Sequence, residues 1–448
     1  MGRGKPGIKI TVGDGKTILK AYKLKNGILY CHVEKEGIIK SNWGITFEKL
    51  DLMLPSFQPP DEDALKFMLR LDDQRGFISA IGVSFVREPE DIVKVRKCIE
   101  NYYHHEFKYS KTNARLRCPY IIAKIETEAG AENIEKILDV ADGAMIARGD
   151  LALQLSREEV PQKQKDIISL CNKRGKIAIT ATEMLASMEE NIEPTRAEVN
   201  DVFNSIVDGT DAVMLSGETS SGKYPAQAVH YMNRITERAE TYFEKIYSRK
   251  TSQNLQRIQV LREGSEKLIE DTTARLKERW QFYRKKGEKW ASGLYHDKYK
   301  KSKEQGTTDR ICAAACELVE EQEFKAIVAS TASGRTIRML SRFRPSVKLI
   351  GIIYDERCRR KLLLSNGVYP LSIGTKTPPA DNTWKNPEAV FQRAAEHCIK
   401  DKLLNKGDRA VFVSGTPLGY YGQGKVNILQ IKTFSIKSRK GVNNFTAK

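Results

Sequence analysis

The sequence predicts an α/β protein with three parts: a small β segment, a main domain with a parallel sheet, and a second, open α/β domain. Two observations predict this. Short apolar strands alternate with amphipathic helices from residue 54 to about residue 240, and the same alternation resumes at residue 307. Near-continuous apolar strands separated by helices are typical of parallel sheets covered on both faces.

The N-terminal segment predicts short antiparallel strands. Apolar or alternating runs at 8–12, 16–22 and 28–33 are separated by the turn signals Gly13-Asp14-Gly15 and Asn26-Gly27. We assign residues 1–54 to a partial β domain, because the segment is too short to be complete.

The main domain, residues 55–246, contains five predicted strands. They cover residues 78–85, 120–126, 143–149, 176–182 and 212–218. Their spacing is compatible with a (β/α)8 barrel, although a closed barrel needs about eight strands. Open sheets of five strands also exist, so the strand number by itself does not decide between the two.

Residues 247–306 predict a basic helical insertion. The net charge of the chain is +18, and residues 245–304 carry 17 Lys or Arg against 8 Asp or Glu, so half of the excess lies there. We interpret this segment as a solvated face. Contact with nucleic acid or an anionic surface is the alternative. Residues 307–448 then form the second α/β domain.

The bulk properties favour a soluble cytoplasmic protein. No apolar run reaches about 18 residues, and the N-terminus has no signal-peptide core. The eight cysteines include no CxxC pair, which suits free thiols in a reducing compartment. Cys312 and Cys316 lie four apart on a predicted helix, but no further ligand accompanies them, so we expect no metal there.

Polar residues follow four of the predicted strands at the carboxyl ends, where parallel barrels place their active sites. A lysine there can stabilise a developing anion, and two carboxylates on neighbouring strand ends can hold magnesium. Surface ion pairs and plain turns are the alternatives. The residues are Lys124, Glu126, Gly149, Asp150, Thr182, Ser216 and Glu218.

A second candidate site lies in the C-terminal domain, between a strand and a helix. Hydroxyl and N–H groups at the start of a helix suit a phosphate, and a plain capped helix start is the alternative. The residues are Thr331, Ser333, Gly334, Arg335 and Thr336.

Two stretches resemble the pyruvate kinase family. IAKIETEAGAENIEKILDVADGAMIARGDLALQL (122–155) resembles the stretch with the catalytic lysine and magnesium ligands, and residues 179–229 resemble the stretch that follows it. The PTRAE and MLSGET blocks are the most specific. The resemblance covers about residues 8–246 and 307–433, and it implies a (β/α)8 barrel, a small β lid and a C-terminal regulatory domain.

The resemblance also implies roles. Lys124 would stabilise the transferring phosphoryl group and the enolate, and Glu126 and Asp150 would hold Mg²⁺ or Mn²⁺. Gly149, Asp150 and Thr182 would receive the substrate carboxylate, with Thr182 near the carbon that gains a proton. Ser216 and Glu218 would complete the rim, and the loop at 331–336 would bind an effector phosphate.

The nucleotide side departs from the family pattern. The family has about three barrel strands before the lid, with residues for nucleotide phosphates and for K⁺, whereas only MGRGKPG precedes the lid here. In the lid, Gly13 replaces an aspartate, and Ser41-Asn42-Trp43-Gly44 lacks the family's lysine pair. We therefore expect the missing strands to come from elsewhere, the sheet to be repacked, or the chain to be incomplete.

The expected function is phosphoryl transfer between phosphoenolpyruvate and ADP, giving pyruvate and ATP, the last step of glycolysis. One alternative is a partial reaction, the metal-assisted enolisation or decarboxylation of a 2-oxo acid. Another is a non-catalytic regulatory or interaction subunit. The resemblance further suggests a homo-oligomer and a sugar-phosphate or nucleotide effector, and neither a membrane nor nucleic acid is an expected partner.

Overall fold

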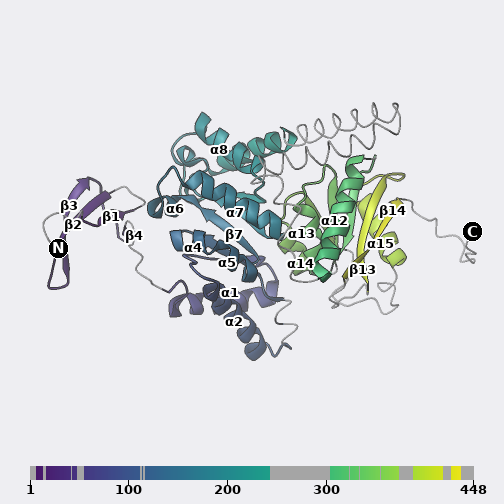
Figure 1. The fold of residues 1–448 in the computed structure, drawn as a ribbon, viewed down its shortest axis with the longest axis horizontal. Helices are drawn as coiled ribbons and strands as arrows, with labels where there is room; N and C mark the ends of the chain where they lie inside the picture. The colour runs from purple at the N-terminus through teal and green to yellow at the C-terminus, as the bar shows by residue number, and fades with distance from the viewer. Residues whose placement is uncertain are drawn as a thin grey trace, which may run out of the picture. The chain divides into compact units, whose positions relative to one another are not determined.

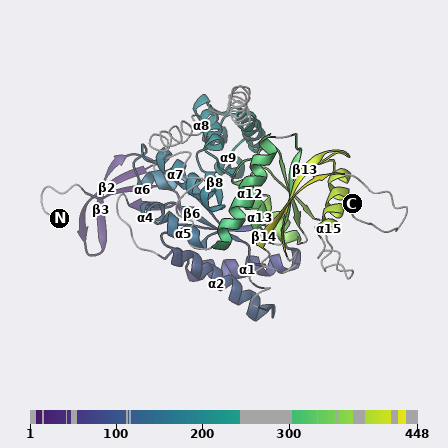
Figure 2. The same ribbon diagram turned by 45° about the vertical axis from the view of Figure 1, so that its right-hand side comes forward.

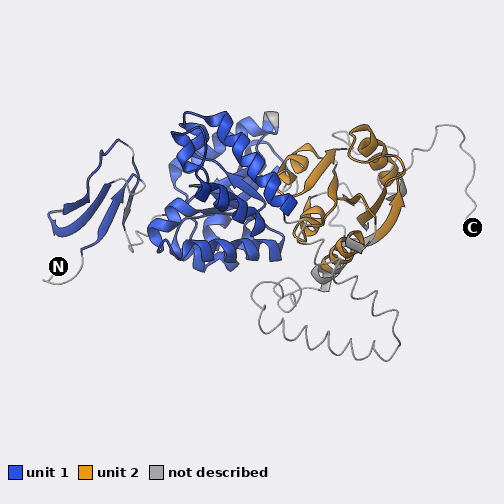
Figure 3. Ribbon diagram, turned by 90° about the horizontal axis from the view of Figure 1, so that it is seen from above, with its two compact units in different colours: residues 1–243 blue, residues 244–448 orange. Residues whose placement is uncertain are grey.

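The structure is a computed structural model, drawn as a ribbon in Figure 1. It forms two compact units, residues 1–243 and 244–448, which Figure 3 colours separately. The predicted insertion at 247–306 lies outside the described residues except at its end, where a helix begins at Lys303. The described residues are 7–13, 17–41, 43–47, 55–110, 114, 117–242, 303–321, 323–331, 333–353, 355–372, 387–416 and 425–434.

The N-terminal sheet is antiparallel, with strand order β3-β2-β1-β4. The three strands predicted in this segment are confirmed. The fourth was not predicted because three residues are too few to show a period. The strands are β1 (Lys9–Val12), β2 (Thr17–Lys25), β3 (Ile28–Lys35) and β4 (Ile45–Phe47).

The central sheet confirms the five predicted strands and their parallel arrangement. The strands pair in chain order from β5 to β9, and within the described residues β5 and β9 each have a single neighbour. The strands β7, β8 and β9 end before the polar residues predicted at their carboxyl ends, and β6 ends between Lys124 and Glu126. The strands are β5 (Ala80–Val83), β6 (Tyr120–Ile125), β7 (Gly143–Ala147), β8 (Ile177–Ala181) and β9 (Ala212–Met214).

Helices follow the central strands and begin and end at recognisable signals. Proline stands in the first turn of α1, α2 and α7, and Gly175 ends α7 in the left-handed conformation (φ 60°). The elements are α1 (Pro59–Arg75), α2 (Pro89–Glu106), α4 (Glu128–Glu132), α5 (Ile134–Val140), α6 (Arg148–Gln154), α7 (Val160–Arg174), a 3-10 turn η1 (Ala186–Glu189), α8 (Arg196–Val207) and α9 (Gly217–Ser220).

The core of this domain lies between one face of the sheet and the helices α2, α5 and α7. In β6, Ile121, Ala123 and Ile125 belong to that core. Because side chains alternate along a strand, Tyr120, Ile122 and Lys124 point to the opposite face. The helix-covered face therefore supplies stability, while the other face carries the candidate lysine.

The C-terminal domain is an open five-stranded sheet in the order β12-β11-β10-β13-β14, in which β14 is the antiparallel edge. Buried clusters on its two faces pack against α12, α13 and α14 on one side and α15 on the other. Figure 2 shows α12 and α13 on one side of β13 and β14, and α15 on the other. The strands are β10 (Ala326–Ser330), β11 (Lys348–Ile353), β12 (Val368–Ser372), β13 (Arg409–Thr416) and β14 (Lys425–Thr433). The helices are α12 (Lys303–Glu321), α13 (Arg335–Ser341), α14 (Glu356–Leu362) and α15 (Pro387–Lys400).

None of the helices in the described part of the chain combines the length and apolarity that a membrane crossing requires.

Candidate active site

The carboxyl ends of β5 and β6 bring a lysine, a glutamate and a serine into direct contact. Lys124 Nζ lies 2.7 Å from Glu126 Oε1 and donates a 3.0 Å hydrogen bond to Ser84 Oγ. Glu126 is only 2% exposed, and its Oε2 accepts a 2.6 Å hydrogen bond from the Phe85 N–H. The cluster places a buried carboxylate and a cation at one point of the rim.

The ends of β7 and β8 meet at a second point of the rim. The Gly149 N–H donates to Thr182 Oγ1 at 2.8 Å, and the Thr182 hydroxyl donates to the Ala181 carbonyl at 2.7 Å. The N–H and the hydroxyl therefore lie at one point of the rim, and each donates a hydrogen bond within the protein. The predicted proximity of Gly149 and Thr182 is therefore present in the fold.

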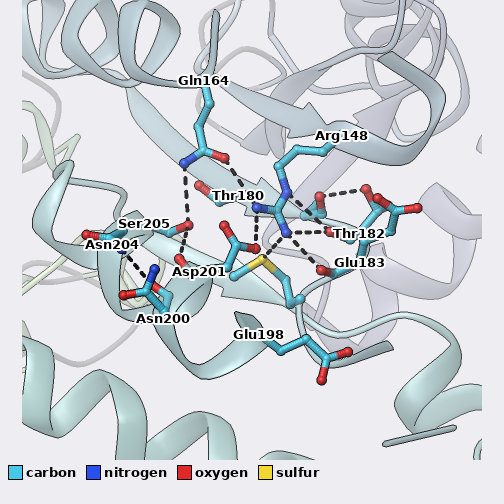
Figure 4. A network of polar contacts seen from close by, with 12 residues as sticks. Arg148, Gln164, Thr180, Thr182, Glu183, Glu198, Asn200, Asp201, Asn204 and Ser205 are labelled. Atoms are coloured by element: carbon cyan, nitrogen blue, oxygen red, sulfur yellow. Dashed lines mark hydrogen bonds and ion pairs between the residues drawn. The ribbon is translucent and has the colours of Figure 1, made fainter. Parts of the chain in front are cut away.

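Arg148 joins this point to the helices beneath it, as Figure 4 shows. Its Nη2 donates to the carbonyl oxygens of Thr182 (2.8 Å) and Glu183 (3.1 Å), and its Nη1 lies 2.6 Å from Asp201 Oδ2 on α8. Arg148 is 8% exposed. No role was predicted for Arg148 from the sequence.

Glu218 also holds backbone in place. Its Oε1 accepts a 3.0 Å hydrogen bond from the Leu185 N–H, and its Oε2 accepts a 2.7 Å bond from the Ser216 N–H. Glu218 is 2% exposed, in the short helix α9 that begins after Ser216. The loop after β8 is thus fixed from β7 by Arg148 and from β9 by Glu218.

The two predicted metal ligands lie on neighbouring elements. Glu126 follows β6, and Asp150 lies in the first turn of α6, directly after β7. Among the described residues no group of three His, Cys, Asp or Glu could hold a metal ion, including at Cys312 and Cys316. A pair of carboxylates completed by water and substrate oxygens suits magnesium, and each Glu126 oxygen retains a lone pair beyond its hydrogen bond. The residues therefore fit such an ion.

The candidate phosphate loop contains both buried and exposed polar side chains. Thr331 Oγ1 accepts a 3.0 Å hydrogen bond from the Gly334 N–H, and both Thr331 and Thr336 are buried. Ser333 and Arg335 are exposed at the start of α13. Gly334 adopts φ 80°, and a Cβ there would lie 2.9 Å from Leu362 Cδ2, so both conformation and space require glycine.

The two lid departures from the family pattern contact each other. Gly13 has φ 62°, its N–H donates to the Gly44 carbonyl at 3.1 Å, and a Cβ built on it would lie 2.1 Å from Cε3 of Trp43. A side chain at position 13 and the Trp43 ring therefore cannot occupy these positions together.

Ser84 and Arg148 are the functional candidates that the sequence analysis left without a role. For Ser84 the sequence carried no specific signal, because its place beside Lys124 follows from the register in which Val83 pairs with Ala123. For Arg148 the signal was a lone arginine at the end of an apolar strand, and such a residue has to find partners when it is buried.

Together, the parallel sheet and its polar carboxyl-end rim define an α/β domain of the kind found in barrel enzymes. The family model for the pyruvate kinase barrel domain matches residues 3–229, and the model for the pyruvate kinase alpha/beta domain matches residues 309–432. The chain belongs to the pyruvate kinase family.

Individual relatives agree with these domain matches. Pyruvate kinase of Lactococcus lactis is 31% identical over 96% of this chain and 69% of its own length. The Clostridium perfringens pyruvate kinase is 32% identical over 96% of this chain and 75% of its own length. A crystal structure of a pyruvate kinase from Cryptosporidium parvum superposes with a TM-score of 0.72 at 25% identity, over 96% of this chain and 73% of that one.

The coverage of the relatives varies. The Sporosarcina psychrophila pyruvate kinase is 32% identical over 90% of this chain, but the match spans 56% of its own length.

Proposed function

We propose that this chain catalyses phosphoryl transfer between phosphoenolpyruvate and ADP, giving pyruvate and ATP. The observation that carries the proposal is the contact of Lys124 with Glu126 and Ser84 at the strand-end rim. Membership of the pyruvate kinase family and the pairing of Gly149 with Thr182 support it.

The lysine supplies the charge that this chemistry needs. Both the transferring phosphoryl group and the enolate left behind carry negative charge, and a fixed ammonium stabilises that charge without having to reorganise. The contacts with Glu126 and Ser84 restrict where Lys124 Nζ can lie. The proposed role of Lys124 is therefore electrostatic.

The neighbouring strand ends bind the three-carbon acid. The Gly149 N–H and the Thr182 hydroxyl receive its carboxylate, and the hydroxyl lies near the carbon that gains a proton. Glu126 and Asp150 would hold Mg²⁺ or Mn²⁺, which supplies positive charge to the carboxylate and the enol oxygen when it is bound. Ser216 and Glu218 complete the rim. K⁺ is expected for the family, although its site is not among these residues.

The test is a coupled assay in which the purified chain forms pyruvate from phosphoenolpyruvate in the presence of ADP, Mg²⁺ and K⁺. Lys124→Ala should lower kcat by about 100-fold to 1000-fold, the usual cost of removing a transition-state contact. Lys136→Ala, which removes an exposed lysine of α5, is the matched control and should retain activity. Absence of turnover by the parent chain would refute the proposal.

A second candidate is enolisation of a 2-oxo acid without phosphoryl transfer, and the contact of Trp43 with Gly13 favours it. An apolar ring takes the place of lid residues that, in the family pattern, approach the nucleotide. Exchange of the pyruvate methyl protons, followed by NMR, should then proceed in the parent chain and stop in Lys124→Ala. A chain that shows this exchange but forms no ATP has the partial activity.

We further propose a cytoplasmic homo-oligomer with an effector phosphate at Thr331, Ser333, Gly334, Arg335 and Thr336. The exposed Ser333 and Arg335 at the start of α13 support the effector site. The eight free cysteines support a reducing compartment.

A further inference from the structure

We infer that Arg148 is a positioning residue: it holds the left-handed backbone of Thr182 and Glu183 in the shape that directs the Thr182 hydroxyl to the rim. The inference rests on the proposed function and extends it to a buried residue that acts through another.

The backbone after β8 is unusual. Thr182 has φ 65° and Glu183 has φ 52°, two consecutive residues other than glycine in the left-handed region. This conformation crowds Cβ against the backbone, and it is most unfavourable for a β-branched residue such as threonine. Surrounding contacts have to hold such a segment in place, and segments of this kind are concentrated at functional sites.

Arg148 supplies those contacts. Its Nη2 donates to the carbonyl oxygens of both left-handed residues, at 2.8 and 3.1 Å, and its Nε donates to the Thr182 carbonyl at 3.3 Å. The planar guanidinium presents its donors from three nitrogen atoms in a fixed plane, which here reach two adjacent carbonyl groups and a carboxylate, whereas all three donors of an ammonium group radiate from a single atom. The residue type at position 148 therefore matches the geometry of the loop.

Arg148 is itself fixed by the helices below the sheet. Its Nη1 lies 2.6 Å from Asp201 Oδ2 on α8 and donates to Gln164 Oε1 on α7 at 3.4 Å. Figure 4 shows Asp201 and Gln164 on one side of the guanidinium and Thr182 and Glu183 on the other. Because Arg148 is held from both sides, a shift of its guanidinium would also move the loop that carries the Thr182 hydroxyl.

The contacts of Arg148 determine where the Thr182 hydroxyl lies. Thr182 Oγ1 accepts from the Gly149 N–H at 2.8 Å, and Gly149 is the next residue after Arg148. The Arg148 side chain thus fixes the loop that contains Thr182, and the Thr182 hydroxyl contacts the N–H of Gly149, the residue that follows Arg148. Loss of Arg148 should misplace Thr182 relative to Gly149 and lower kcat more than it changes KM.

The test uses two variants of the full chain. Arg148→Lys keeps the charge opposite Asp201 but cannot reach both carbonyl groups, and we expect kcat for phosphoenolpyruvate to fall about 100-fold, as for other small misplacements of reacting groups. Asp201→Asn keeps the arginine but loosens its support, and should cause a smaller loss. Melting temperatures identify any variant that fails to fold. If one variant does not fold, the kcat of the other variant tests the inference.

A second substitution separates positioning from simple stability. Glycine accepts the left-handed conformation without strain, so Glu183→Gly in the Arg148→Lys background should restore part of kcat. Lys402→Gly is the matched control, because Lys402 is also exposed and left-handed (φ 57°) but lies in the C-terminal domain. The control should restore nothing.

Amide hydrogen exchange of residues 182–188 gives a readout that does not depend on turnover. Exchange should accelerate in Arg148→Lys and slow again when Glu183→Gly is added. Unchanged exchange and unchanged kcat in Arg148→Lys, or equal effects of the two glycine substitutions, would overturn the inference. If the parent has no turnover, the proposed function fails, and the exchange results alone decide whether Arg148 holds the loop.

Discussion

The carboxylate of Glu126 serves two neighbouring groups at once. One oxygen lies 2.7 Å from Lys124 Nζ, and the other accepts from the N–H of Phe85, a residue in the left-handed conformation with φ 53°. A strand-end glutamate in this family position therefore also fixes the loop after β5. Substitutions of Glu126 are expected to disturb that loop as well as any bound metal.

Cysteine reactivity follows burial at the scale of single residues. Burial raises the pKa of the Cys171 and Cys312 thiols to about 12, so both stay protonated at neutral pH. Cys31 is partly exposed. We predict that iodoacetamide at pH 8 labels Cys31 in the native chain and leaves Cys171 and Cys312 unmodified, as measured by peptide mass spectrometry.

The control for this labelling is the chain in urea, where all eight cysteines should react. Rapid labelling of Cys171 in the native chain would show that α7 does not pack on the sheet as described.

At the scale of elements, the family-specific PTRAE block forms the start of α8. Thr195 Oγ1 accepts from the Glu198 N–H at 3.3 Å, and Glu198 Oε2 accepts from the Thr195 N–H at 2.8 Å, a capping box. Glu198 also accepts from the N–H and hydroxyl of Ser187, which lies in η1. The block therefore joins two elements, and its specificity has a structural cause.

The pKa of Glu198 predicts how this junction depends on pH. Burial alone would raise that pKa, but hydrogen bonds from Ser187 and Thr195 outweigh it and lower the pKa below its usual 4.5. The stabilisation is therefore present above the unfolded pKa and lost as pH falls through the folded pKa. Glu198→Gln should cost about 1 kcal/mol at pH 7, a modest value because the carboxylate is mostly solvated, and progressively less below pH 4.5.

Urea unfolding between pH 7 and pH 3 measures the difference in the free energy of unfolding between the parent chain and Glu198→Gln. Glu158→Gln, at an exposed turn position, is the matched control and should show no such dependence. A stability difference that stays constant from pH 7 to pH 3 would contradict the assigned role of Glu198.

The strand β12 shows where local patterns fail. It includes Pro370, which has no N–H to donate, so the local sequence does not predict a strand there. Within the described residues β12 is an edge strand whose one partner is β11, and edge strands are where proline is tolerated. A position at the edge of a sheet is a property of topology and cannot be read from a five-residue segment.

At the scale of the whole molecule, the C-terminal unit has its own cores on both faces of its sheet. The buried clusters centred on Ile337 and Phe412 consist of residues from this unit alone. We predict that a fragment spanning residues 303–434 folds by itself and unfolds in one cooperative thermal transition, as followed by circular dichroism and calorimetry.

The comparison for this fragment is the full chain, in which one of the thermal transitions should match that of the fragment. A fragment that unfolds without cooperativity would show that residues 1–302 contribute to its core.

The sequence by itself determined the five central strands, their parallel arrangement and the polar residues at the ends of four of them, because strand periodicity and turn chemistry act over a few residues. Only the tertiary structure decided that Ser84 meets Lys124, that Trp43 packs on Gly13, and which groups hold Arg148. The partners of Arg148 lie 16, 34 and 53 residues away along the chain. No local period encodes contacts of that range, which arise when parallel strands bring their carboxyl ends to one edge and helices close beneath them.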